Sequence, residues 1–411
     1  MRQRCLIALA TLPLAFPAWS APTPAPAFED LLASAAVTAP RLLEEAALLR
    51  AAQGRARQSS AVPNPQLGLE VENILGSAPY SGYSQAQTTL SLSQPLELAG
   101  QRGARARAGR AEVDLALARV RQAQADFAYD LAVAYAAAEF AQLRARRLAE
   151  DLARSDEDLG MARALVDAGR EAPLRVAQAE AAQAAAQADL ALARVEASMG
   201  LAELAGLTGD PVPYTGIQSS LLSRPTALPG HVADIVPQSP AVATARAERE
   251  LADHRVRVEQ KRALPSLGVS AGLRKFRGDA ATAWVGGVSV SLPLFDRNGG
   301  AIAASRAERD AAEVRMTAAG LEAASAWRGA LAQSVAVGNR VTATDRGELA
   351  SQEAYRLARI AYEAGRAPLA ELLATRRALT EAQLRALDAR QARVQAEATF
   401  ARLSGRTPFS E

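Results

Sequence analysis

The side chains that could bind a metal ion are few and widely separated. After residue 20 the chain offers only five soft or borderline donors, which are His231, His254, Met161, Met199 and Met316. A zinc or copper site needs such donors at short spacings on one or two elements. Because these five are scattered, the sequence predicts no bound metal and no cofactor.

Catalytic chemistry has equally little support. Neither histidine is accompanied by a serine, cysteine or carboxylate cluster at a useful spacing, and the sequence contains no glycine-rich phosphate loop. The net charge is +3, but acidic and basic residues alternate along the chain and form no basic stripe interleaved with aromatics. The sequence therefore argues against an enzyme and against a nucleic-acid partner.

The most suggestive polar residues surround two similar segments, residues 168–174 and residues 364–369. In each segment a glycine can adopt the left-handed conformation that ends a helix, and a proline starts the next helix with a fixed φ. The four turn residues are Gly169, Pro173, Gly365 and Pro368. A helix hairpin alone explains this composition. A functional interpretation adds the charges around both turns, namely Asp167, Arg170, Arg175, Glu363, Arg366 and Glu371.

The two segments belong to an internal repeat of roughly 200 residues. Residues 65–69 return as residues 265–269, and residues 91–96 return as residues 289–294. We therefore expect two structural repeats, over residues 21–208 and 231–411, joined by a linker over residues 209–230.

The N-terminus has the features of a secretory signal peptide. Arg2 and Arg4 precede an apolar stretch, and small residues at Ala18 and Ser20 mark a cleavage site. We expect a signal peptide over residues 1–20, cleaved after Ser20. The one cysteine, Cys5, would leave with it and therefore cannot anchor a lipid.

Each repeat contains two segments in which apolar and polar residues alternate, which predicts strands with one apolar and one wet face. We place these strands near residues 66–74, 88–96, 266–274 and 284–293. This pattern is typical of a membrane barrel wall around an aqueous lumen. Tyr80, Tyr83 and Trp284 lie near the connecting loops and are candidate interfacial aromatics.

The remaining segments have the period of helices and coiled coils. The expected helices are residues 28–60, 101–168, 174–207, 231–262, 298–364 and 369–403. Each of the two long helices would measure about 100 Å, and two shorter ones placed end to end would match it. The predicted fold class is mainly α with a β-barrel part.

Four strands cannot close a barrel, so closure requires several chains. The signal peptide, the two-fold repeat, the strand pairs leading into long helices and the Ala-Gly-Arg hairpins resemble the TolC-type outer-membrane efflux family. The resemblance covers essentially the whole mature chain. Residues 64–73 and 89–102 resemble the cobalt-zinc-cadmium resistance branch more specifically.

The resemblance implies a homotrimer whose twelve-stranded outer-membrane barrel continues as a periplasmic tunnel of twelve helical rods. It implies a passive exit duct for divalent heavy-metal cations, working with a periplasmic adaptor (membrane fusion) protein and an inner-membrane RND-type pump, and contacting outer-membrane lipid. Glu371 matches the acidic position that faces the tunnel axis in the family, and Ala374 stands where some relatives have a second gate carboxylate. The same hairpin tips meet the adaptor in the family, so adaptor docking is their alternative role.

Two other functions stay open at this point. One is an outer-membrane duct for drugs or for type I protein export, since the cargo is set by a pump that this sequence does not contain. The other is a periplasmic coiled-coil adaptor. An adaptor would carry a lipoyl-like β-rich domain between its helices and no lipid-facing strands, and the alternating strands favour the duct.

Overall fold

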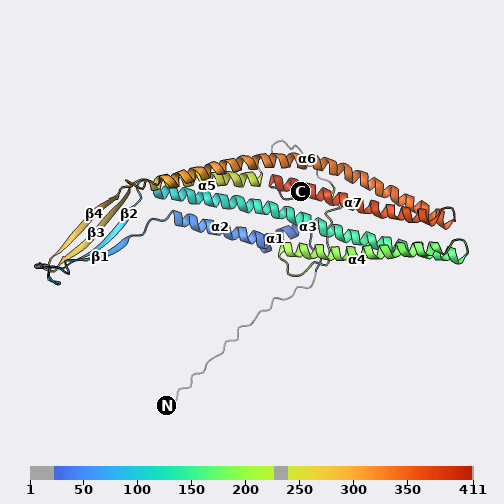
Figure 1. Ribbon diagram of the computed structural model, residues 1–411, viewed down its shortest axis with the longest axis horizontal. Helices are drawn as coiled ribbons and strands as arrows, with labels where there is room; N and C mark the ends of the chain where they lie inside the picture. Colours follow the sequence, from blue (N-terminus) through green and yellow to red (C-terminus); the bar gives the residue numbers. More distant parts are fainter. Residues whose placement is uncertain (1–22, 226–238, 410–411) are drawn as a thin grey trace, which may run out of the picture. The chain divides into compact units, whose positions relative to one another are not determined.

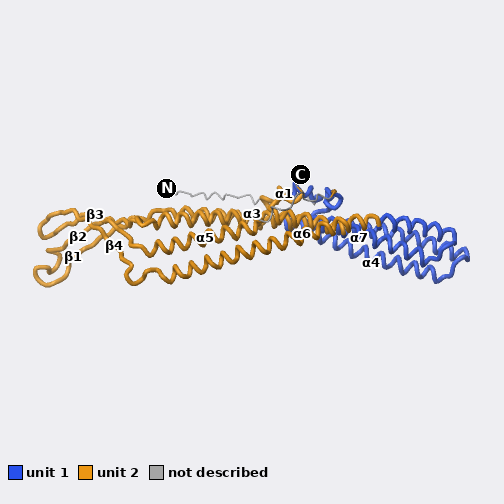
Figure 2. The backbone as a smooth tube through the Cα atoms, turned by 90° about the horizontal axis from the view of Figure 1, so that it is seen from above, with its two compact units in different colours: residues 1–31, 134–224, 347–388 blue, residues 32–133, 225–346, 389–411 orange. Residues whose placement is uncertain are grey.

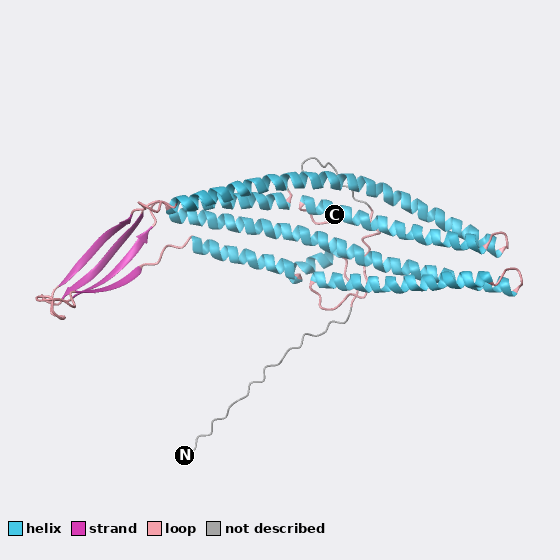
Figure 3. Ribbon diagram, viewed as in Figure 1, coloured by secondary structure: helices cyan, strands magenta, loops and turns pink. Residues whose placement is uncertain are grey.

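The computed structural model describes residues 23–225 and 239–409. The predicted signal peptide, with Cys5, and His231 lie outside these residues. Figure 1 and Figure 3 show the helices and strands of the described chain. In chain order they are α1 (Phe28–Thr38), α2 (Pro40–Ser59), β1 (Gln66–Glu72), β2 (Gln87–Leu96), α3 (Gln101–Asp167), α4 (Leu174–Thr208), α5 (Pro240–Arg262), β3 (Ser266–Phe276), β4 (Thr282–Ser291), α6 (Gly299–Glu363) and α7 (Leu369–Ser404).

The expected first helix is in fact two helices. The predicted helix over residues 28–60 is interrupted at Ala39, whose backbone is extended at φ −65° and ψ 121°. Pro40 follows as the first residue of α2. A residue before proline is sterically disfavoured in the helical region, so the chain bends there. The prediction of one continuous helix was wrong.

The other elements lie close to their expected positions, with one exception at α5. The observed strands begin and end within two residues of the predicted bounds. The helix predicted from His231 begins at Pro240, after an extended Ser239, and residues 231–238 lie outside the described chain. Proline suits the first turn of a helix because its missing N–H would have no partner there.

The predicted linker is also more ordered than expected over its described part. Leu221 and Leu222 are buried, and the buried carboxylate of Glu139 on α3 accepts hydrogen bonds from their backbone N–H groups at 2.8 and 3.2 Å. Arg224 forms an ion pair with Glu29 at 2.5 Å. The described part of the linker is therefore held to α3 and α1 at Leu221, Leu222 and Arg224.

The chain divides into two compact units (Figure 2), and they do not coincide with the two repeats. Unit 1 comprises residues 1–31, 134–224 and 347–388, and unit 2 comprises residues 32–133, 225–346 and 389–411. Each unit takes segments from both halves of the sequence. The repeat is therefore a repeat of elements and not of separately folded domains.

Unit 2 contains an antiparallel four-stranded sheet in the order β1-β2-β3-β4. Its register aligns apolar residues across all four strands, for example Leu69, Leu90, Leu273 and Trp284. All four side chains are exposed, and Trp284 is 81% exposed. This face is therefore apolar and uncovered in a single chain.

The neighbouring register row gives the other face a polar character. This row contains Glu70, Thr89 and Arg274. Arg274 donates a hydrogen bond to the hydroxyl of Thr89 at 2.9 Å and forms an ion pair with Glu72 at 3.1 Å. The sheet thus has one apolar face and one polar face, as its alternating sequence predicts.

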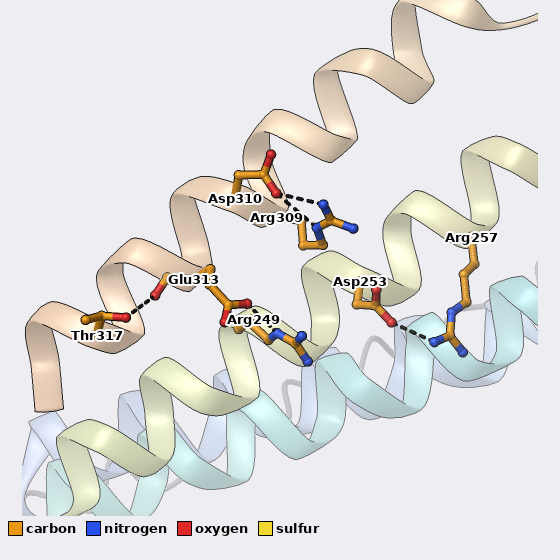
Figure 4. A network of polar contacts seen from close by, with 7 residues as sticks. All are labelled: Arg249, Asp253, Arg257, Arg309, Asp310, Glu313 and Thr317. Carbon is orange, nitrogen blue, oxygen red and sulfur yellow. Dashed lines mark hydrogen bonds and ion pairs between the residues drawn. The ribbon is translucent and has the colours of Figure 1, made fainter.

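The helices of unit 2 follow the same order as the strands. Ion pairs join α2 to α3 (Arg55 to Glu112, 2.6 Å), α3 to α5 (Arg119 to Glu248, 2.8 Å) and α5 to α6 (Arg249 to Glu313, 2.9 Å). Figure 4 shows the last of these pairs. Exposed ion pairs of this kind contribute about 0–1 kcal/mol each. These ion pairs identify which helices are neighbours, but they add little to the stability of the fold.

The packing of α2 against α3 allows a prediction about Gly109. A Cβ atom at Gly109 would lie 2.9 Å from the Cα atom of Ala56, whereas a Cβ atom at Gly54 would meet no atom within 4 Å. Gly109→Leu should therefore separate the two helices and lower the thermal midpoint, since overpacking costs about 1–3 kcal/mol. Gly54→Leu, the matched control, should keep or raise it because leucine favours helix over glycine. Equal midpoints for the two variants would contradict this close packing.

Candidate functional site

The two helix hairpins of unit 1 end in the same backbone motif. Gly169 has φ +68° and Gly365 has φ +70°, the left-handed conformation in which a side chain is strained. The N–H of Arg170 donates to the carbonyl of Leu165 at 2.9 Å, and the N–H of Arg366 donates to the carbonyl of Ala361 at 2.8 Å. These are Schellman helix ends. Residues 168–173 and 364–368 are called the first and second tips below.

A shared apolar core holds the two hairpins together. Its members come from α3, α4, α6 and α7, so neither hairpin has a separate core at this level. They are Leu159, Ala162, Ala179, Tyr355, Tyr362, Leu369, Leu372 and Leu379. The core therefore fixes where the tip residues lie.

Arg170 of the first tip reaches the second tip. A Cβ atom on Gly365 would lie only 2.8 Å from Nη2 of Arg170, so the guanidinium group lies against the glycine of the other turn. The structure thus brings one predicted charge of the first tip into contact with the second.

Two other candidate charges are engaged close to their own positions in the chain. Arg175 forms an ion pair with Glu171 at 3.5 Å and donates to the side chain of Gln178 at 3.0 Å. Glu363 forms an ion pair with Arg359 at 3.1 Å. Arg175 forms no ion pair with Glu371 in the described chain.

Glu371 is exposed in the first turn of α7. Its backbone N–H donates to the carbonyl of Pro368 at 3.0 Å, and a carboxylate at this position is favoured by the helix dipole. Among the described residues, Glu371, Arg366, Arg170 and Asp167 form no ion pair within 4 Å. The carboxylate of Glu371 therefore has no arginine partner within the described chain.

The sequence analysis missed a buried polar cluster below the tips. Asp158 on α3 and Arg376 on α7 are 1% and 2% exposed, and Nε of Arg376 lies 3.7 Å from a carboxylate oxygen of Asp158. Tyr355 donates to Asp158 at 3.4 Å, and Thr380 donates to Asp151 at 2.7 Å. The cluster joins the two hairpins by charge as well as by apolar contact.

A comparison with known protein families shows the family of this chain. A family model described as outer membrane efflux protein matches residues 31–210 and 233–406. The chain belongs to this family. The resemblance predicted from its motifs is therefore confirmed.

Relatives and solved structures of the efflux family agree with this assignment. The chain is 43% identical over 388 residues to the nickel-cobalt-cadmium resistance protein NccC of Alcaligenes xylosoxydans xylosoxydans, covering 94% of this chain and 88% of NccC. It is 44% identical over 309 residues to the nickel and cobalt resistance protein CnrC of Cupriavidus metallidurans, covering 75% and 73%. The outer-membrane channel OprN matches with a TM-score of 0.80 at 23% identity, covering 93% and 90%. The fold is therefore that of an outer-membrane efflux channel.

Among the described residues, no group of three or more His, Cys, Asp or Glu side chains is placed to hold a metal ion. Within residues 23–225 and 239–409, each helix is either too short or too polar to cross a membrane.

The environment of Asp158 predicts a pH dependence. Burial raises the pKa of its carboxyl to about 6, although the positive charge of Arg376 and the hydrogen bond from Tyr355 act in the opposite direction. The folded state therefore keeps a proton that the unfolded state releases above about pH 4. Stability should fall as pH rises from about 4 to about 6, by at most about 3 kcal/mol per chain, and should level off above pH 6.

Thermal unfolding at a series of pH values checks this. Asp158→Asn should flatten the dependence between pH 4 and pH 6, because asparagine stays uncharged at every pH, as the protonated carboxyl does below pH 6. Asp167→Asn, which removes an exposed carboxyl from the same helix, should leave the dependence intact. Parallel pH profiles for the native chain and Asp158→Asn would show that this carboxyl is not the titrating group.

Proposed function

We propose that the protein is the outer-membrane subunit of a tripartite efflux system and forms a passive exit duct for divalent heavy-metal cations. Its partners in this proposal are a periplasmic adaptor protein and an inner-membrane RND-type pump that supplies the energy. We infer the metal cargo from one observation. Nearly the whole chain is similar to a protein named for nickel, cobalt and cadmium resistance.

The sheet supports assembly into a closed ring. In the described chain β1 pairs only with β2, and β4 pairs only with β3. An open strand edge in lipid leaves N–H and C=O groups without partners, at several kcal/mol each. Three copies of this four-stranded sheet give twelve strands, enough to close a barrel with its apolar face toward lipid and its polar face toward water.

The aromatic residues fit this orientation. Tyr80 and Tyr83, in the loop between β1 and β2, are 49% and 63% exposed, and Trp284 lies in the apolar row of β4. Tyrosine and tryptophan favour the membrane interface, where the ring is in contact with lipid and the polar atom with water. We assign these three residues to the interfacial girdle of the barrel.

Metal tolerance and molecular mass test the proposal together. Cells without this protein should become sensitive to nickel, cobalt or cadmium, and the intact gene should restore growth. The detergent-extracted protein should have about three times its chain mass in light scattering, because each chain leaves two sheet edges open. A monomer with full β content would overturn the assembly. Sensitivity to organic compounds alone, with unchanged metal tolerance, would instead favour a drug duct.

The tip charges suggest an entrance gate in this duct. In a trimer, three copies of Glu371 would surround the axis and form a ring of negative charge, which attracts cations and rejects anions. Their exposure and lack of an ion pair in the single chain leave the carboxylates available for this role. Arg366 and Arg170 are tip cations that form no ion pair among the described residues.

Single-channel recording in planar bilayers checks the gate. Glu371→Gln keeps the size of the side chain and removes its charge, so cation selectivity should fall while trimer yield stays the same. Glu363→Gln is the matched control, because Glu363 already pairs with Arg359. Arg366→Ala should raise the resting conductance. If neither Glu371→Gln nor Arg366→Ala alters conductance or selectivity, and both weaken cross-linking to the adaptor, the tips are docking surfaces instead.

A further inference from the structure

The two helices at the ends of the ion-paired series α2, α3, α5 and α6 expose large apolar side chains. On α6, Val314, Leu321 and Val335 are 69%, 68% and 56% exposed, at multiples of seven residues. On α2, Leu43 and Leu48 are each 48% exposed. Seven-residue spacing of apolar side chains is the pattern of a coiled-coil seam. On α6 this spacing marks a seam without a partner in the described chain, and α2 exposes two leucines five residues apart.

A charge pattern repeats on all four helices of the layer. On α3, α5 and α6 a glutamate is followed seven residues later by an arginine, at Glu112 and Arg119, Glu248 and Arg255, and Glu308 and Arg315. On α2 the corresponding pair is Glu45 and Arg55. All eight side chains line one groove of about 350 Å³ across the four helices. They therefore lie on the same face of the layer.

Because neighbouring helices are antiparallel, this pattern produces two levels of alternating charge. α2 and α5 lead into strands, whereas α3 and α6 leave them. At the level nearer the sheet the order from α2 to α6 is Arg55, Glu112, Arg255 and Glu308. The observed pair of Arg55 and Glu112 sets the register of α2 on α3. The pair of Arg249 and Glu313 places Arg255 level with Glu308 (Figure 4 shows this helix pair).

The level farther from the sheet has the opposite signs. Its order from α2 to α6 is Glu45, Arg119, Glu248 and Arg315, and Arg119 pairs with Glu248 at 2.8 Å. Glu45 and Arg315, at the two ends, form no ion pair within 4 Å among the described residues. Because each copy contributes the four helices α2, α3, α5 and α6 to this set, the last charge of one copy is opposite in sign to the first charge of the next.

We infer that α6 of one copy docks beside α2 of a second copy of this chain, with Arg315 facing Glu45 of that second copy. The inference rests on the proposed closure of the sheet by several copies, because pairing β4 with β1 of the next copy brings α6 beside α2. The exposed apolar side chains supply contact area and the charges supply specificity. Two α2 helices placed side by side at the same level would bring Glu45 of one copy against Glu45 of the other. This repulsion disfavours pairing of α2 with α2.

Cross-linking tests the placement. The chain has a single cysteine, Cys5 in the predicted signal peptide, so introduced cysteines give a clean background. Glu45→Cys with Arg315→Cys, treated with a short bismaleimide, should give covalent dimers and trimers on a denaturing gel. Arg55→Cys with Glu112→Cys joins residues that pair within one chain and should give only monomers. Glu44→Cys with Arg315→Cys, turned about 100° around α2, should react severalfold less.

Charge reversal tests the pairing itself. Glu45→Arg and Arg315→Glu should each lower the trimer yield severalfold, and the double variant should restore it. A threefold mass with no intermolecular product from Glu45→Cys with Arg315→Cys would overturn this inference alone. Failure of the double charge reversal to restore the yield would also overturn it. A monomeric native protein would overturn the proposed closure and this inference together.

Discussion

The rule that a sheet in lipid cannot keep an open edge is the constraint from which the proposed assembly follows. Each unpaired backbone group in the hydrocarbon costs several kcal/mol, more than an exposed ion pair or a helix cap contributes. Four antiparallel strands with one apolar face have two such edges. In the proposed assembly the edge strands find partners in neighbouring copies, and the same pairing brings the attached helices into contact.

The repeated charge pattern places opposite charges beside each other because neighbouring helices in unit 2 are antiparallel. A glutamate and an arginine seven residues apart on one helix lie level with the opposite charges on an antiparallel neighbour. Arg119 and Glu248, from different halves of the sequence, meet in this way at 2.8 Å. A single duplicated motif can therefore provide pairs within the chain and, in the proposed ring, between chains as well.

Local patterns were enough to predict the elements but not the contacts between distant segments. Alternation located the strands, and the glycines and prolines located the tips, because these signals lie within a few residues. The break at Ala39 was also encoded locally, by Pro40, and was overlooked. The division into two units was not predictable in this way, because each unit joins segments from both halves. The contact of Arg170 with Gly365 likewise depends on how the hairpins pack.

The buried cluster shows where a local signal existed but could not be interpreted alone. Ser155 interrupts an apolar seam between Leu152 and Leu159, and Arg376 lies between Leu372 and Leu379. A polar side chain in an apolar seam costs free energy unless it has a partner. For Arg376 that partner is Asp158, which the packing of α7 on α3 places opposite it. Leucine at these positions would bury more apolar area and avoid the desolvation of two charges. A charged cluster is stable only where Asp158 and Arg376 lie opposite each other. It therefore favours one register of α3 against α7, whereas a uniform apolar seam would tolerate several registers.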